Sequence, residues 1–310
     1  MKTKIFIDGR EGTTGLQIEQ RIRNRADLEL LEIEPAKHKD PAERKKLLNA
    51  ADAAFLCLPD DAARESAALV DNPRTVVIDT STAHRTDHAW VYGLPELSAQ
   101  HRERIQTAKR IANPGCHATG FIVCVYPLVR LGLLDPSAQL SCFSLTGYSG
   151  GGKKMIAEYE DTERALSLDS PRLYGLTQRH KHLAEMAAVC GLENPPFFTP
   201  AVSDFYSGMA VTVDLPAVSL LGGVTRAALE EALAEFYADA ALFTVEGNRA
   251  DGFIAANEMA GKPGLKLYAG GADGRITLTA VFDNLCKGAS GAAVQNMNLA
   301  LGLDEYASLL

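Results

Sequence analysis

The chain has 310 residues, of which 46% are hydrophobic and 23% charged, and it carries a formal net charge of −8. This composition excludes a mainly disordered protein, and the length predicts two domains of ordinary size. The acidic balance argues against a nucleic-acid partner, because such surfaces need clustered Lys and Arg, but it leaves room for a local basic pocket that binds a small anion.

The sequence also lacks the marks of a membrane or exported protein. No stretch reaches the roughly 18 to 20 uncharged apolar residues of a membrane span, and residues 1–4 lead directly into an apolar segment without the features of a signal peptide. The six cysteines form no C-x-x-C pair and show no metal-ligand spacing. We therefore expect reduced thiols, no bound metal, no membrane partner and a cytoplasmic location.

The first third of the chain alternates β-branched runs with helical patterns, which is typical of βαβ units in a parallel sheet. A helix between the first two strands places Ile18 and Ile22 on its apolar face. The pattern predicts an α/β fold with a Rossmann-type, doubly wound parallel sheet. The expected strands lie at residues 4–8, 28–33, 53–58, 75–79 and 110–112, and further helices at 41–49 and 60–70.

After Gly115 the pattern changes. Residues 118–134 are apolar nearly all round, which predicts a buried helix with a kink at Pro127. Longer connections separate the strands that follow, so we expect a mixed or antiparallel sheet. These strands are expected at 139–145, 197–202, 209–215, 266–269 and 277–282, with helices near 182–190, 225–241 and 289–301.

A glycine-rich loop directly follows the first strand and opens the first helix. Glycines at this position allow a tight turn, and the helix N-terminus can then bind a pyrophosphate. The spacing is G-x-x-G-x-x-G, which differs from the usual dinucleotide motif, and similar loops occur in flavodoxin-like proteins that bind no nucleotide. Its placement favours a dinucleotide. The residues expected to hold it are Gly9, Arg10, Gly12, Thr13, Thr14 and Gly15.

The identity of the dinucleotide stays open from the residues alone. Glu32 and Glu34 follow the second strand, where an acidic side chain holds the ribose 2′-hydroxyl of NAD. Arg10 and the basic residues 37–39 lie in the same region and can neutralise the 2′-phosphate of NADP. All of these charges can equally be solvated loop residues.

Cys116 differs from the other cysteines because it stands at the start of the buried helix. Pro114 holds the preceding residue extended, and Gly115 lets the backbone turn sharply. In the first turn the helix dipole favours the thiolate, which is the reactive form of a cysteine. We therefore predict that Cys116 is a nucleophile and that the other five cysteines are packing residues.

A catalytic thiol needs a proton donor or acceptor, and His180 and His182 are the candidates, with Arg179 beside them. Two residues that are two apart cannot both face one site within a regular helix. We therefore expect one histidine to act and the other to support it.

Two further loops carry candidate ligand-binding residues. The segment 149–153 combines glycines with Lys153, which predicts an oxyanion or phosphate nest, although a flexible loop is the simpler interpretation. Residues 79–85 follow the fourth strand, at the carboxyl edge where doubly wound sheets bind ligands. Arg85 can contact a phosphate there or pair with Asp87.

Taken together, these motifs resemble those of the N-acetyl-γ-glutamyl-phosphate reductases of arginine biosynthesis, in particular their shorter type. The resemblance extends over residues 5–305. It is carried by the glycine loop and by the segments 56–60, 79–85, 90–97, 113–120, 149–153, 180–182 and 295–298. The Asn-Pro-Gly-Cys motif at 113–116 and the segment 90–97 are specific, whereas the glycine loop is not.

The resemblance implies a second domain of α+β type, like that of glyceraldehyde-3-phosphate dehydrogenase. It implies a dinucleotide-binding domain at 1–115, a catalytic and dimerisation domain at 116–286, and a C-terminal helix at 287–310 that returns to the first domain. An exposed sheet in the second domain would further imply a homo-oligomer, a dimer or tetramer.

The same resemblance assigns NADP(H) as cofactor and an acyl phosphate or semialdehyde as substrate. Cofactor contacts are then also expected at Ser81 and Asn284, the latter beside the nicotinamide. The substrate and its phosphate are expected to contact Arg85, Asn113, Ser149, Gly150, Lys153 and Arg179. Two positions depart from the family pattern: Lys153 stands where longer members often have Arg, and His117 where Tyr is frequent.

The expected reaction is reduction of N-acetyl-γ-glutamyl phosphate through a thioester on Cys116, with His180 or His182 as acid and base. Backbone amides of Cys116 and of segment 149–153 are expected to form the oxyanion hole. The alternatives are a sister acyl-phosphate reductase of the aspartate-semialdehyde or carrier-linked aminoadipate type, a Cys-His hydrolase or acyltransferase, and a non-catalytic dinucleotide sensor.

Overall fold

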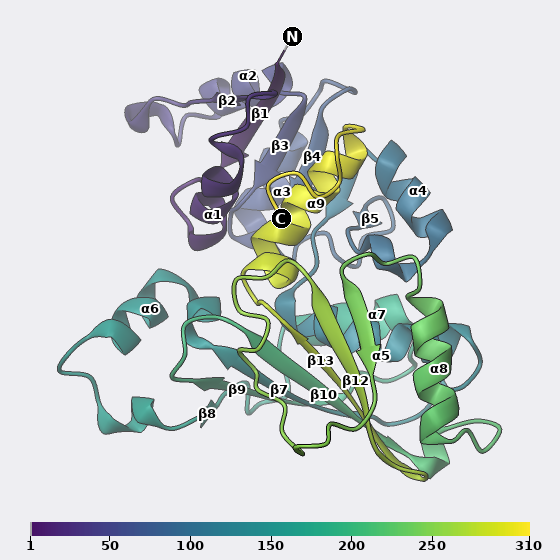
Figure 1. Ribbon diagram of the computed structural model, residues 1–310. Coiled ribbons are helices and arrows are strands. Elements are labelled where there is room, and N and C mark those ends of the chain that lie inside the picture. Colours follow the sequence, from purple (N-terminus) through teal and green to yellow (C-terminus); the bar gives the residue numbers. More distant parts are fainter. Residues whose placement is uncertain (1) are drawn as a thin grey trace. The chain divides into compact units, whose positions relative to one another are not determined.

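The computed structural model describes residues 2–310, and the chain forms two compact units (Figure 1). Unit 1 contains the residues up to Gly115 together with Ala289–Leu310, and unit 2 contains Cys116–Gly288. The second boundary lies two residues after the one expected at 286/287. A continuous helical segment explains the difference, because a π-helical turn at Cys286–Ser290 leads directly into the last helix.

Unit 1 contains a six-stranded sheet in the order β2-β1-β3-β4-β6-β5, and every neighbouring pair is parallel. This confirms the predicted Rossmann-type sheet. The strand β5 was not expected because two residues are too short to show a pattern. The strands are β1 (Thr3–Asp8), β2 (Leu28–Leu31), β3 (Ala53–Leu56), β4 (Val76–Asp79), β5 (Val91–Tyr92) and β6 (Arg110–Ala112).

Helices cover both faces of this sheet, as the doubly wound pattern requires. Ile5 on β1 belongs to an apolar cluster with Ile18 and Val294, whereas the neighbouring Phe6 belongs to a separate cluster with Leu48. The helix at 99–107 was missed because Ile105 is its one buried residue. The helices are α1 (Thr13–Ile22), α2 (Pro41–Ala50), α3 (Asp60–Ala68), α4 (Ala99–Thr107) and α9 (Gly291–Ala300), with short 3-10 turns at Pro35–Lys37 and Pro95–Leu97.

Unit 2 is built on a seven-stranded mixed sheet in the order β11-β12-β13-β10-β7-β9-β8. The pairs β11/β12 and β7/β9 are parallel and the others antiparallel. The mixed sheet was predicted, whereas β8 and β11 were not. The strands are β7 (Ser141–Gly147), β8 (Arg172–Leu173), β9 (Phe197–Ser203), β10 (Met209–Pro216), β11 (Phe243–Glu246), β12 (Leu265–Ala272) and β13 (Arg275–Phe282).

The helix α5 (Cys116–Arg130) packs against β10, β13 and α7 (His182–Cys190) within unit 2. It begins two residues before and ends four residues before the expected helix at 118–134. Gly132 follows it with a φ of +69°, in the left-handed region that ends a helix, and Leu131 is therefore exposed. Pro127 lies inside the helix. The expected kink there stays a prediction.

The remaining helices of unit 2 lie at the sheet edges and in connections. Figure 1 shows α8 running beside β12, which it contacts. The segment expected to be a glycine nest is a 3-10 turn that leads into α6. These elements are α6 (Gly152–Glu160), α8 (Arg226–Phe236) and the 3-10 turns Tyr148–Gly151, Leu166–Asp169 and Ala217–Ser219. Over residues 2–310, no helix has both the length and the apolar character that a membrane span requires.

Replacing Gly120 by Ala is expected to destabilise the protein by about 1–3 kcal/mol, the usual cost of overpacking a filled core. The new Cβ would lie 2.4 Å from Val211 Cγ2, so the steric cost should exceed the better helix propensity of Ala. Urea unfolding followed by circular dichroism measures the change. Adding Val211→Ala removes the obstructing methyls, so the double variant should lose less than the sum of the single losses. Simple additivity would contradict this steric explanation.

Candidate active site

The glycine loop of unit 1 packs tightly against the end of β3. Gly9 has a φ of +83°, and a Cβ there would lie 2.3 Å from the carbonyl oxygen of Cys57. A Cβ at Gly15 would lie 2.8 Å from Arg10 Cα. Gly12, by contrast, is exposed and meets nothing closer than 3.5 Å. Close packing therefore requires glycine at positions 9 and 15, whereas Gly12 leaves the surface of the loop uncovered.

This loop suits the pyrophosphate of a dinucleotide. Gly12 is the N-cap of α1; no side chain in the described part of the chain caps this helix, and its first turn contains no acidic residue. The amides of Thr13, Thr14 and Gly15 therefore lie at an uncapped helix N-terminus, where an anion is stabilised by N–H groups and by the helix dipole.

Arg10 is the one cationic residue within the loop at residues 9–15, and its side chain is paired with carboxylates. Its Nε lies 2.6 Å from Glu19 Oε2 and its Nη1 3.5 Å from Glu32 Oε1. A ligand phosphate would therefore compete with these two carboxylates for the guanidinium.

The segment after β4 forms a buried polar network around Asp79. Ser81 donates its hydroxyl to Asp79 Oδ2 at 2.7 Å, and His84 Nδ1 lies 2.7 Å from the same oxygen. The His84 ring stacks on Trp90 with centroids 4.0 Å apart. The Ser81 side chain, expected to bind cofactor, is thus oriented by Asp79.

Arg85 and Asn113 are buried and joined to each other. Arg85 donates from Nε to the carbonyl of Asn113 at 2.9 Å and from Nη2 to the carbonyl of Thr80 at 3.0 Å. The Asn113 side chain donates to the carbonyl of Ala289 and accepts from Asn296. These contacts brace the loops at the carboxyl edge of the unit 1 sheet, and the expected phosphate contacts stay predictions.

Cys116 is the first residue of α5 and is partly exposed, which confirms its predicted place in the first helical turn. Gly288 lies against it, since a Cβ at Gly288 would be 2.8 Å from Cys116 Cβ. Several other thiols are held in the protonated form. Burial raises the pKa of Cys57 to about 12, and it also raises the pKa values of Cys124, Cys142 and Cys190.

Three histidines meet in unit 2, and one of them, His117, directly follows Cys116 in the chain. The ring centroids of His180 and His182 are 4.7 Å apart. The His117 centroid lies 5.6 Å from that of His180 and 5.5 Å from that of His182. The expected limit on residues two apart does not apply, because α7 begins at His182 and His180 precedes it. Both rings therefore reach the same place. We call His117, His180 and His182 the histidine cluster.

Hydrogen bonds fix the orientation of the His117 ring. Its Nδ1 lies 2.7 Å from Ser144 Oγ, and its Nε2 lies 2.7 Å from the hydroxyl of Tyr174. None of these three residues was predicted from the sequence to have a role in the site. A histidine inside an almost wholly apolar helix was an available signal for His117, whereas nothing in the sequence marks Ser144 or Tyr174.

Gln178 anchors the segment that carries the other two histidines. Its side chain accepts from the backbone N–H of Phe198 at 2.9 Å and donates to the Phe198 carbonyl at 2.8 Å. Gln178 itself has a φ of +55°, a left-handed conformation that a non-glycine residue adopts at a cost. These two hydrogen bonds tie the segment to β9. The His180 ring then packs against the Phe198 ring, with centroids 5.1 Å apart.

The electrostatics favour neutral imidazoles at His117 and His180. Burial, with a smaller contribution from His180, lowers the pKa of His117 to about 3. Burial and the nearby Lys181 charge lower the pKa of His180. Burial raises the pKa of Tyr174, and the proximity of Cys116 adds to this effect. Tyr174 therefore stays a phenol that can donate a hydrogen bond.

The predicted nest at 149–153 is already partly used by the fold. The backbone N–H of Ser149 donates to the carbonyl of Tyr206 at 3.0 Å, and that of Gly152 donates to the carbonyl of Ser149. The expectation that the whole segment supplies oxyanion-hole amides is therefore wrong for these two, because the 3-10 turn and the neighbouring loop consume them.

Hydrogen bonds hold the side chain of Ser149 in this segment. Ser149 Oγ accepts from the side chain of Asn284 at 3.1 Å, and Asn284 Oδ1 accepts from the backbone N–H of Gly208. Asn284 is buried, and both of these hydrogen bonds lie within unit 2. Lys153 and Arg179 are exposed.

Comparison with known proteins identifies the family. A family model described as "Semialdehyde dehydrogenase, dimerisation domain" matches residues 116–284, and one described as "Semialdehyde dehydrogenase, NAD binding domain" matches residues 4–108. N-acetyl-γ-glutamyl-phosphate reductase 2 of Nostoc sp. is 44% identical over 320 residues, covering 99% of both chains. The chain belongs to the N-acetyl-γ-glutamyl-phosphate reductase family. The reductase of Sinorhizobium medicae is 46% identical over 308 residues, covering 97% of this chain and 99% of its own.

Solved structures support the fold of this family member. Aspartate semialdehyde dehydrogenase II from Vibrio cholerae, complexed with ASA, superposes with a TM-score of 0.71 at 15% identity, covering 97% of this chain and 99% of that one. Aspartate semialdehyde dehydrogenase with NADP from Candida albicans gives a TM-score of 0.66 at 14% identity, with 99% of both chains covered. The predicted fold class is thereby confirmed.

In the native protein at neutral pH, iodoacetamide should modify Cys116 before any other cysteine. The thiolate is the reactive form, and the other thiols are protonated or shielded by burial. Peptide mass spectrometry after a short exposure measures this, and all six cysteines should react in urea. The Cys116→Ser variant should show no rapid modification. Faster labelling of Cys57 or Cys286 than of Cys116 would refute the prediction.

Proposed function

We propose that this family member catalyses the NADPH-dependent reduction of N-acetyl-γ-glutamyl phosphate to N-acetylglutamate 5-semialdehyde and phosphate, a step of arginine biosynthesis. The observation that carries the proposal is the placement of Cys116 as the first residue of α5, one residue before His117 of the histidine cluster. Membership of the reductase family supplies the substrate.

Cys116 opens the reaction by attacking the acyl carbon of the substrate. The thiol loses its proton, the carbon–oxygen bond to phosphate breaks, and hydrogen phosphate leaves with that proton. A thioester to Cys116 remains. Gly288 packs against the nucleophile so closely that a Cβ there would lie 2.8 Å from Cys116 Cβ, so a side chain at this position would displace Cys116.

The second half of the reaction needs a hydride and a proton. The nicotinamide, when bound, supplies the hydride. The cluster supplies the proton: the backbone N–H of His182 donates to His180 Nδ1 at 3.3 Å, so neutral His180 carries its own proton on Nε2. His180 passes this proton to the developing oxyanion and takes up a replacement proton from water, which gives a thiohemiacetal. The thiohemiacetal then releases the aldehyde, and its hydroxyl proton returns to the sulfur as the Cys116 thiol.

Arg10 supports NADP rather than NAD as the cofactor, because a guanidinium close to the glycine loop can pair with the 2′-phosphate. Glu32 is the residue that opposes this choice. The proposed dinucleotide contacts are Gly9, Arg10, Gly12, Thr13, Thr14, Gly15, Ser81 and Asn284. The proposed substrate and phosphate contacts are Arg85, Asn113, Ser149, Gly150, Lys153 and Arg179. We place the enzyme in the cytoplasm, since its six cysteines are all free thiols.

Replacing Cys116 by Ser should abolish the phosphate-dependent oxidation of N-acetylglutamate semialdehyde, because the weaker hydroxyl nucleophile cannot form the acyl intermediate at a useful rate. Replacing His180 by Gln should lower kcat by about 10²–10⁴-fold, the usual contribution of an acid–base group. The reverse assay is run with NADP and with NAD, and with aspartate semialdehyde as competing substrate.

Cys124→Ala is the matched control, since it removes a thiol from the interior of the same helix. It should keep most of the wild-type turnover. Near-normal turnover of Cys116→Ser would overturn the mechanism, and a preference for aspartate semialdehyde would overturn the substrate assignment. A preference for NAD would overturn the cofactor assignment alone.

The open face of the unit 2 sheet supports a homo-oligomer. Along β10, Val211 and Val213 are buried, whereas Asp214 is exposed on the opposite face. That face also carries Phe143, which is 44% exposed, and Phe197, which is 62% exposed. Large apolar side chains of this kind are typical of an interface.

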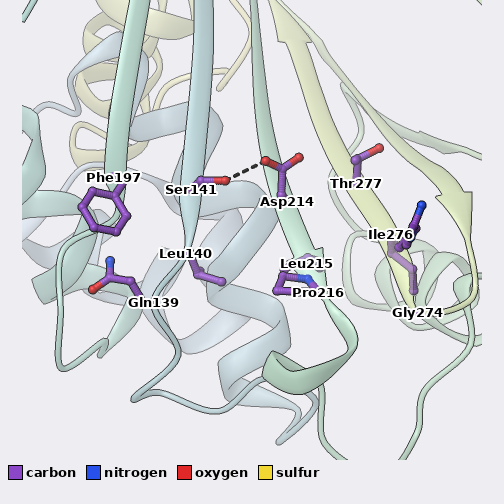
Figure 2. Close-up of a pocket in the computed structure, with 11 residues that line it drawn as sticks. Gln139, Leu140, Ser141, Phe197, Asp214, Leu215, Pro216, Gly274, Ile276 and Thr277 are labelled. Atoms are coloured by element: carbon purple, nitrogen blue, oxygen red, sulfur yellow. Dashed lines mark hydrogen bonds between the residues drawn. The ribbon is translucent and has the colours of Figure 1, made fainter. Parts of the chain in front are cut away.

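A pocket of about 420 Å³ lies at one end of this face (Figure 2). Figure 2 shows Phe197 beside Ser141, which donates to Asp214 across β7 and β10 at 2.6 Å. We propose that a second copy of this chain covers the face, because the matching family model describes residues 116–284 as a dimerisation domain.

The double variant Phe143→Asp/Phe197→Asp should therefore shift the protein from dimer or tetramer to monomer, because two charges would be buried without partners. Sedimentation velocity measures the change. Leu310→Asp is the control, because Leu310 is also exposed and apolar but belongs to unit 1. An unchanged oligomer in the double variant, or a monomeric wild type, would contradict this interface.

A further inference from the structure

The histidine cluster brings together three imidazoles, the side chains that most often bind transition metals. The imidazoles of His117, His180 and His182 each offer one nitrogen, and these nitrogens all lie within 4.8 Å of one another. The three ligands come from α5, from the loop before α7 and from the first residue of α7. Their spacing in the sequence, 62 residues and then one, matches no metal-binding motif, so only the folded chain brings them together.

The geometry is close to what zinc requires. Zn–N bonds of about 2.0–2.1 Å in a tetrahedral site place ligand nitrogens about 3.4 Å apart. The ligand nitrogens would thus have to approach by up to about 1.4 Å, which side-chain rotation can provide at the partly exposed His180. Three imidazoles leave one coordination position for water or for another ligand.

The surroundings of His117 suit a metal ligand. A coordinating histidine normally uses its second ring nitrogen in a hydrogen bond, which fixes the ring. His117 has a hydroxyl partner at each nitrogen, Ser144 at Nδ1 and Tyr174 at Nε2. Whichever nitrogen binds a cation, the other keeps a hydroxyl partner.

Two charged residues near the cluster act on a bound cation in opposite directions. Lys181 lies between the two later histidines and repels a cation. Glu185 lies one turn after His182 on the same face of α7 and is buried, so its carboxylate compensates a positive charge near that face. Neutral imidazoles are the form that binds metal, and three rings in such close contact cannot all be protonated because of their mutual repulsion.

We propose that His117, His180 and His182 form a binding site for a divalent transition metal of the Zn²⁺ class, and that its occupation inhibits the enzyme. The inhibitory part rests on the proposed function. A metal bound to His180 removes that ring from proton transfer, because a coordinated imidazole can no longer cycle its proton at the ligating nitrogen. The cation would thus act as a reversible inhibitor, since imidazole ligands release it to a chelator.

The binding test uses the full chain with Zn²⁺ in isothermal titration calorimetry and with Co²⁺ in visible absorption, under a non-thiol reductant. The wild type and Cys116→Ser should each bind one metal ion per chain, and Co²⁺ should show the intense bands of four-coordination. His117→Gln should bind at least tenfold more weakly, because it removes one of three ligands while an amide still bonds to the neighbouring hydroxyls. His88→Gln is the matched control, since it removes an exposed imidazole outside the cluster.

Circular dichroism verifies that His117→Gln is folded, and His180→Gln, at a less buried position, gives a second test of the same loss. The proposal is overturned if the wild type binds no metal, if both cluster variants bind like the wild type, or if Cys116→Ser loses binding, which would indicate a thiolate site instead.

Activity provides an independent measurement. Zn²⁺ should inhibit semialdehyde oxidation by the wild type, EDTA should restore it, and the concentration for half-inhibition should rise at least tenfold in His117→Gln. Metal binding without any reductase activity would refute the proposed function but leave the site in place. Full activity with the site occupied would refute the inhibitory role.

Discussion

The close packing of α5 against β10 and β13 is the constraint on which the rest of unit 2 depends. At Gly120 the helix approaches Val211 so closely that no Cβ fits between them. The axis and the depth of α5 are therefore determined by the sheet beneath it. Since Cys116 and His117 are the first two residues of this helix, the same packing determines where the thiol and the first imidazole lie.

A second segment has to meet the start of α5 for the site to exist. The double hydrogen bond of Gln178 to the backbone of Phe198 ties the histidine-bearing loop to β9. Since β9 pairs with β7, which carries Ser144, the loop is tied to the same sheet that holds the hydroxyl partner of His117. This explains how residues more than sixty positions apart form a cluster with ring centroids within 5.6 Å.

The candidate ligand-binding loop of unit 1 differs from the unit 2 site, because it is formed by residues that are close in the sequence. The glycine loop needs only the end of β1, the start of α1 and the neighbouring end of β3. The family model for the NAD-binding domain and the parallel sheet agree with the interpretation of this loop. Arg10 shows the limit of a local prediction: it pairs with both Glu19 and Glu32, and neither ion pair was predicted.

The sequence by itself determined the parallel sheet of unit 1, the helix that begins at Cys116 and the reductase family, because periodicity and short motifs depend on neighbouring residues. Only the tertiary structure decided that His117 joins His180 and His182, that Tyr174 contacts this group, and that the Ser149 amide is used by Tyr206. Those contacts join distant segments through the mixed sheet of unit 2. Their partners are set by strand order and helix packing, which no local pattern of residues encodes.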